Sequence, residues 1–179
     1  MRLALVLALT AVPILAQPVA KPWRAILEER LALYGHRNWI VIADSAYPLQ
    51  SAPGIETINS GESQIETVRH VFATLAKTPQ VRPVVYLDSE LPFVSEGDAP
   101  GIGAYRQLLD AMWEKYLQGQ KPVSRLHESI IAQLDQASKT FNVLIIKTNM
   151  MLPYTSVFLE LRAGYWTDEA EQRLRQAIH

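Results

Sequence analysis

Short apolar runs alternate with longer segments of helical periodicity along most of this 179-residue chain, and this alternation limits its fold more than any other feature. Runs of mainly aliphatic and aromatic residues predict strands at 39–43, 55–59, 84–87, 123–126, 141–147 and 155–161. Apolar residues at helical spacing predict helices at 21–34, 62–77, 104–118 and 127–139. Strands that alternate with helices predict an α/β fold, with a mainly parallel sheet sandwiched between helical layers.

The first twenty residues differ in kind from the rest of the chain. Arg2 gives a positive start, residues 3–15 form an apolar run, and small residues follow at Ala16 and Ala20. This pattern predicts a secretory signal peptide at 1–20, cleaved near residue 16 or 20, rather than a spanning helix. The expected location is then periplasmic or secreted, with no stable membrane insertion after processing. An uncleaved membrane-anchoring segment is the alternative.

The rest of the chain predicts one domain at 21–166 and a helical tail at 167–179. Hydrophobic residues make up 49% of the sequence and charged residues 20%, which is enough to build a core without further support. There is no cysteine, so disulfides, thiolate metal sites and cysteine nucleophiles are excluded. The formal net charge of -1, without a run of basic residues, predicts no nucleic-acid partner.

Polar residues that could take part in catalysis or ligand binding lie at both ends of one predicted strand. His36 precedes the strand at 39–43, and Asp44 follows it. Ligands of open α/β sheets lie beyond the carboxyl ends of the strands, which is where Asp44 projects. The spacing alone puts His36 at the opposite end, so the two residues need not meet. Each also fits a simpler role, His36 on the surface after a helix and Asp44 in a turn.

Two segments of the sequence carry a resemblance to a known family. Residues 33–36, 40–44 and Pro48, which include Gly-His and a strand that ends in Asp, resemble the N-terminal signature of the D-ribose pyranase and L-fucose mutarotase family (RbsD/FucU). Residues 152–159, followed by Gly164, are similar to the family's Pro-Tyr strand near the C-terminus. The resemblance covers the whole predicted domain and implies a single RbsD-like domain.

The resemblance also implies an activity. The family interconverts monosaccharide ring forms, pyranose with furanose or one anomer with the other, without a metal or a cofactor. Ring opening needs positioned acid and base groups, and histidine suits both tasks because its ordinary pKa is about 6.5. By resemblance, His36 and Asp44 are catalytic, and Tyr154, Ser156 and His127 bind the monosaccharide substrate. The family places its sites at subunit interfaces, so a homo-oligomer is implied.

Two departures from the family pattern keep a second function open. Ser156 stands where the family has an asparagine, and residues 147–151 replace its usual Thr-Gly-Glu. These differences favour a non-catalytic sugar-binding protein on the same fold. The family is also usually intracellular, in contrast to the predicted signal peptide.

The other polar and aromatic clusters predict no further site. The four histidines include no pair at helical metal-ligand spacing, and no Gly-x-Ser-x-Gly nucleophile motif is present. The acidic stretch at 88–90 predicts a solvated loop. Trp113 and Tyr116 have the helical spacing of core or oligomer contacts rather than of a platform for sugar stacking.

Overall fold

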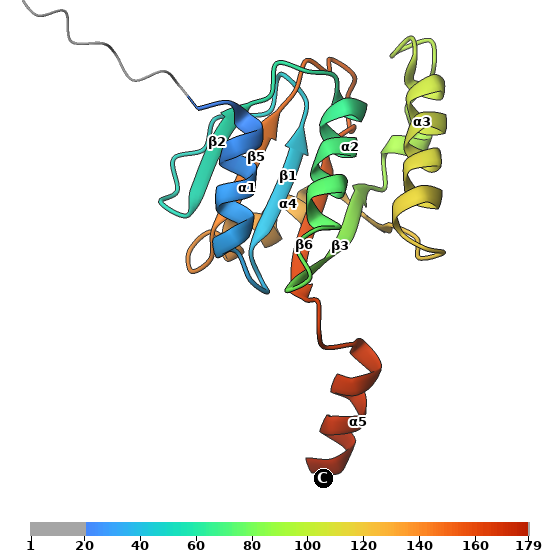
Figure 1. Ribbon diagram of the computed structural model, residues 1–179. Helices are drawn as coiled ribbons and strands as arrows, with labels where there is room; N and C mark the ends of the chain where they lie inside the picture. The colour runs from blue at the N-terminus through green and yellow to red at the C-terminus, as the bar shows by residue number, and fades with distance from the viewer. Residues whose placement is uncertain (1–20, 179) are drawn as a thin grey trace, which may run out of the picture.

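Six strands form one mixed sheet in the computed structural model, which describes residues 21–178 (Figure 1). The strands are β1 (Trp39–Ala43), β2 (Ile55–Asn59), β3 (Val81–Asp88), β4 (Val123–Arg125), β5 (Val143–Lys147) and β6 (Val157–Ala163). Their order is β2-β5-β1-β6-β3-β4, and β6 alone runs antiparallel to its neighbours. The prediction of a mainly parallel sheet is therefore confirmed. The predicted signal peptide at 1–20 lies outside the described residues.

Helices cover both faces of this sheet. Three of them, α1 (Trp23–Leu33), α2 (Gln64–Leu75) and α3 (Ile102–Tyr116), contribute to the core on one face. On the other face α4 (His127–Ala137) packs alone. Because both faces are covered, the central strands β1 and β5 are buried almost along their whole length, as their continuous apolar sequences predict.

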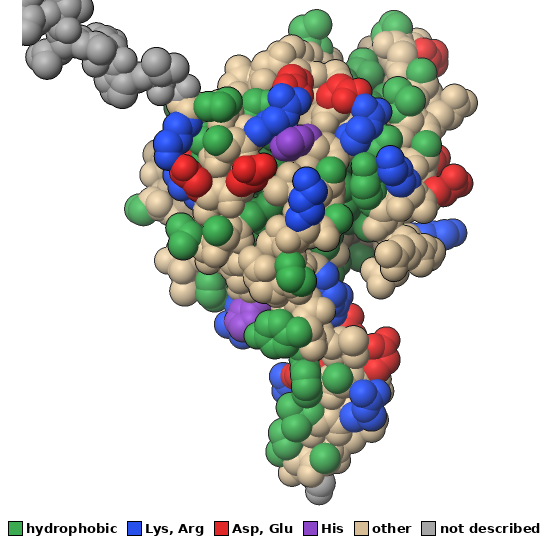
Figure 2. Space-filling model, in the orientation of Figure 1, with side chains coloured by type: hydrophobic (Ala, Val, Ile, Leu, Met, Phe, Trp, Pro, Cys, Tyr) green, Lys and Arg blue, Asp and Glu red, His purple; other side chains and the backbone are tan. Residues whose placement is uncertain are grey.

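The C-terminal helix α5 (Asp168–Ile178) projects away from the domain, and none of its residues is buried (Figure 1). Figure 2 shows hydrophobic side chains along one side of this projection. Leu174 and Ile178 are among the exposed apolar residues of the helix. The apolar side of this helix has no partner within the described residues.

A buried polar network lies beneath the carboxyl edge of the sheet. The Gln64 side chain is fully buried, and its amide nitrogen donates to the carbonyl oxygens of Ile42 and Thr155, both at 2.9 Å. The hydroxyl of Thr148 lies 2.6 Å from Oε1 of Gln64 and 2.9 Å from the carbonyl oxygen of Ala43. One amide from α2 therefore fixes the end of β1, the end of β5 and the start of β6 relative to one another.

One stretch of sheet edge is left open beside β3. The short strand β4 pairs only with residues 86–88 of β3, so Pro83 has a neighbour on one side only. Its partner across the pair is Leu161, whose backbone N–H and carbonyl bond to Asn38 and Arg37 on the β1 side. Pro83 therefore occupies a position where β6 requires no donor, and its ring nitrogen faces the open edge.

The Gln64 network predicts a large loss of stability on substitution. Gln64→Met keeps most of the side-chain volume but removes the donor to two buried carbonyls and the acceptor of the Thr148 hydroxyl. We expect the free energy of unfolding, measured by urea titration, to fall by about 2–4 kcal/mol. Gln107→Met, at an exposed position of α3, is the matched control and should change it by less than about 0.5 kcal/mol. Equal effects of the two substitutions would contradict this role for Gln64.

Candidate functional site

The carboxyl edge of the sheet collects polar residues from segments that are distant in sequence. Five of the six strands run in the same direction, so they all end at this edge, where β6 begins. Asp44 follows β1, Asp88 ends β3, His127 opens α4 after β4, and Tyr154 precedes β6. This is where ligands bind in open α/β sheets.

His127 is held by a buried carboxylate. Its Nδ1 atom lies 3.1 Å from Oδ1 of Asp88, which is 1% exposed. The Glu90 carboxylate accepts the backbone N–H of His127 and so fixes the first turn of α4. With Nδ1 bound to Asp88, Nε2 is the ring nitrogen left to exchange a proton with a ligand.

The burial of Asp88 changes its titration. Removal from water raises the pKa of Asp88 to about 6, and the nearby His127 ring partly opposes this rise. Above this pH the carboxylate is ionised and accepts the Nδ1 proton of His127. The prediction of a solvated loop at 88–90 is therefore wrong for Asp88, because this residue is the last of an interior strand and points inward.

A pocket of about 280 Å³ lies between the turn after β1 and the start of α4, and Asp44 and His127 both line it. Tyr47 and Gln50 also line it, and their buried Oη and Oε1 atoms have no hydrogen-bond partner among the described residues. Burial raises the pKa of Tyr47, so its hydroxyl stays protonated. The residues that line the pocket thus include a neutral hydroxyl, an amide, a carboxylate and an imidazole, which are the groups that fix the orientation of a small polar ligand.

Asp44 has two roles available at once. Its Oδ1 atom accepts the backbone N–H of Ala46 at 2.8 Å, which is the turn chemistry expected of an aspartate after a strand. The side chain is nevertheless half-buried and lines the pocket with His127. The structure therefore leaves the second carboxylate oxygen as the one that can contact a ligand.

Tyr154 lies against His127 in a strained backbone conformation. The two rings meet edge to face with centroids 5.8 Å apart, and Tyr154 has a φ of 56°, which is unfavourable for a residue with a side chain. The next residue holds this geometry, because the Thr155 carbonyl accepts from the Tyr105 hydroxyl at 2.7 Å as well as from Gln64. Ser156 follows and is only 2% exposed, so little of its side chain is open to a ligand.

His36 is far from these residues. It lies in the exposed turn between α1 and β1, at the opposite edge of the sheet. The five residues of β1 separate it from Asp44 by roughly 15 Å. The structure thus brings together Asp44, His127 and Tyr154 of the residues singled out in the sequence. Ser156 is buried two residues after Tyr154, and His36 lies at the opposite edge of the sheet.

Sequence reasoning missed Asp88, Tyr47 and Gln50. Tyr47 and Gln50 flank Pro48 in an irregular loop, and only the fold shows that their polar atoms are buried beside His127. Within residues 21–178 no group of three acidic, histidine or cysteine side chains is arranged to hold a metal ion. No helix in the same range has the length and apolar character to span a membrane.

Comparison with known proteins supports the fold. Neither a protein-family model nor a curated protein matches the sequence. Among solved structures, the chain is similar to Bacillus subtilis RbsD complexed with D-ribose, with a TM-score of 0.53 and 19% identity over 86% of this chain and 100% of that one. The chain therefore has the RbsD-like α/β fold, and the resemblance to the RbsD/FucU family is confirmed at the level of the fold.

Two further solved structures are similar at lower TM-scores. The fucose mutarotase of Streptococcus pneumoniae in complex with L-fucose has a TM-score of 0.49 and 19% identity, over 79% of this chain and 96% of that one. FucU of Bifidobacterium longum has a TM-score of 0.49 and 21% identity, over 78% and 94%.

The prediction of a periplasmic or secreted protein is wrong. The RbsD/FucU family, whose fold this chain has, consists of cytoplasmic sugar-metabolism enzymes. The prediction rested on Arg2, on the apolar run at 3–15 and on the small residues Ala16 and Ala20, all of which lie outside the described residues.

Asp88 gives a prediction on stability and pH. Its pKa is raised from 3.8 to about 6 in the folded protein, so the folded state holds an extra proton between these values. The contribution of Asp88 to stability is therefore present at pH 4 and is lost as the pH rises through 6. Asparagine does not ionise, so the Asp88→Asn variant keeps this contribution as the pH rises. We expect its free energy of unfolding at pH 8 to exceed that of the wild type by about 1–2 kcal/mol.

Urea unfolding at pH 4, 6 and 8 measures this difference. Asp110→Asn, at an exposed carboxylate of α3, is the control and should leave the pH profile unchanged. If the free energy of unfolding of Asp88→Asn changes with pH from 4 to 8 as that of the wild type does, ionisation of Asp88 does not destabilise the folded protein as proposed.

Proposed function

We propose that this protein interconverts the ring forms of a monosaccharide by general acid/base catalysis in the pocket beside His127. The observation that carries this proposal is the buried Asp88 carboxylate, which orients a histidine beside the unpaired polar atoms of Tyr47 and Gln50. Such a pocket suits a small neutral molecule with several hydroxyl groups. The likeness of the fold to RbsD with bound D-ribose agrees with a monosaccharide.

The proposed reaction needs two proton transfers. Opening the ring breaks the bond between the anomeric carbon and the ring oxygen. The anomeric hydroxyl loses a proton and becomes a carbonyl, while the ring oxygen gains a proton and becomes a hydroxyl. Nε2 of His127 accepts the first proton and returns it on closure, because Asp88 stabilises the charged imidazole through Nδ1. Closure by the same or another hydroxyl completes the exchange without redox chemistry.

The remaining residues of the pocket bind and orient the sugar. The free oxygen of Asp44 accepts a sugar hydroxyl, and the Tyr47 hydroxyl donates to one. Tyr154, which is exposed beside His127, covers the sugar ring from the side of β6. Ser156 is buried, so we assign it no direct contact with the sugar.

His36 completes the site of a neighbouring copy in the assembly that we propose. The sheet edge that carries His36 also exposes Leu33 and Tyr165, and the edge with the pocket exposes Leu49 and Met151. Large exposed apolar residues at both edges favour contact between one edge and the other in a homo-oligomer. In that arrangement His36 delivers a proton to the ring oxygen of a sugar held by the next subunit.

NMR magnetisation exchange with D-ribose and L-fucose tests the activity. The wild type should accelerate exchange between ring forms for at least one sugar. His127→Gln should slow this exchange by about 10²- to 10⁴-fold, because it removes the base but keeps a polar side chain. His70→Gln, on α2 and away from the pocket, is the matched control and should keep the wild-type rate. Sugar binding without any acceleration would favour the non-catalytic sugar-binding protein instead.

Mixed oligomers test the shared site. His36→Gln and His127→Gln should each be inactive alone. When the two are unfolded and refolded together, about a quarter of the interface sites receive both histidines, and activity should return to about that level. Light scattering reports the oligomeric state of each sample. A monomeric protein, or an oligomer without recovered activity, would rule out a site shared between subunits.

A further inference from the structure

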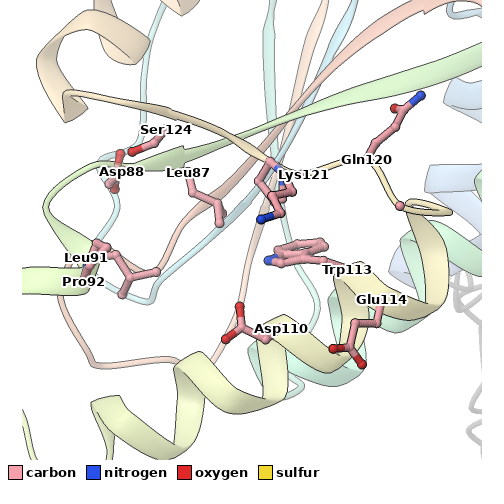
Figure 3. Close-up of a pocket in the computed structure, with 12 residues that line it drawn as sticks. Leu87, Asp88, Leu91, Pro92, Asp110, Trp113, Glu114, Gln120, Lys121 and Ser124 are labelled. Carbon is pink, nitrogen blue, oxygen red and sulfur yellow. The ribbon is translucent and has the colours of Figure 1, made fainter.

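A second cavity, separate from the pocket at His127, has Asp88 among its lining residues. It occupies about 520 Å³ between the edge formed by β3 and β4 and the helix α3 (Figure 3). Leu87, Leu91 and Trp113 give it apolar walls. This volume falls within the range of pockets that bind small molecules.

Two residues that line this cavity each carry a buried polar atom without a hydrogen-bond partner among the described residues. The Oδ2 atom of Asp88 and the Nε1 atom of Trp113 have no hydrogen-bond partner among the described residues, although their side chains are 1% and 6% exposed. Buried polar groups are nearly always paired, and one is an acceptor while the other is a donor. A single molecule with hydroxyl groups at two positions can pair with both.

The charges around the cavity disfavour an anionic ligand. Asp110 and Glu114 line the cavity in addition to Asp88, and Lys121 is the only basic residue among its lining residues. In the view of Figure 3 the nitrogen ends of Lys121 and Trp113 turn toward the side where Leu91 lies. Three carboxylates against one ammonium repel phosphate and carboxylate groups, whereas all of these side chains can bond to hydroxyls.

We propose that this cavity is a second binding site, for an uncharged small molecule that carries several hydroxyl groups on a compact carbon skeleton. Its hydroxyls donate to Oδ2 of Asp88 and accept from Nε1 of Trp113 and from Lys121, while its carbon–hydrogen surface contacts the apolar walls. The site is distinct from the pocket at His127, and it shares only Asp88 with the proposed catalytic machinery.

Sharing Asp88 links the two sites. A hydroxyl that donates to Oδ2 withdraws negative charge from Oδ1, which holds His127 at 3.1 Å. Occupancy of the second cavity therefore weakens the hold of Asp88 on the histidine, and binding at one site changes binding at the other by the same factor.

Fluorine NMR of protein labelled with 5-fluorotryptophan tests the second site. The chain has four tryptophans, so Trp113→Phe assigns the Trp113 signal directly; the other three Trp→Phe variants assign it by elimination if that variant does not fold. Glycerol, xylitol and myo-inositol are the neutral probes, and D-ribose 5-phosphate is the anionic one. We expect a saturable shift of the Trp113 signal with at least one neutral probe and none with the phosphate.

Variants at the cavity decide whether the shift reports this site. Lys121→Met removes a donor and keeps the aliphatic stem, so it should weaken binding roughly tenfold. Lys115→Met, on α3 but not among the cavity residues, should have no effect. The same titration of His127→Gln should keep the Trp113 shift even if the proposed catalysis fails. The proposal is overturned if no neutral probe gives a saturable shift, or if Lys121→Met binds as tightly as the wild type.

Discussion

A single buried amide determines where the polar residues at the carboxyl edge of this protein can lie. Gln64 enters from the first turn of α2 and bonds to β1 at Ile42, to the start of β6 at Thr155 and to Thr148 after β5. Asp44 lies two residues beyond the first of these contacts, and Tyr154 lies immediately before the second. Because an unpaired amide in this position is costly, the loops around the pocket have little freedom to move independently.

The sequence predicts much of this fold because its signals are local. Strand and helix periodicities place each element within a few residues of its observed bounds, and β3 differs most, since it begins at Val81 rather than at 84. The candidate site was predicted less completely, because its pairing spans distant segments. Asp88 and His127 are 39 residues apart and meet only because β3 and β4 are parallel neighbours. No local pattern distinguishes Asp88 from a solvated acidic residue, since Ser89 and Glu90 follow it.

Asp88 is a residue that the proposed chemistry requires but that lowers the stability of the folded protein. A neutral residue in its place would avoid the cost of a buried charge, yet only a carboxylate both orients Nδ1 of His127 and stabilises its charged form. Tyr154 carries a comparable conformational cost in its positive φ. Both costs fall where the proposed chemistry needs a fixed geometry. The apolar and almost entirely buried strands β1 and β5 beside the site help to support them.

The proline in β3 has a consequence for how this protein behaves at high concentration. An open strand edge is a template on which another chain can add a strand and begin a fibril. At Pro83 the edge lacks the N–H that an incoming strand requires, and the pyrrolidine ring obstructs its approach. The interruption costs nothing within the sheet, because β6 makes no demand for a donor there. Pro83 thus hinders the addition of another strand along the part of β3 that does not pair with β4, and so opposes aggregation there.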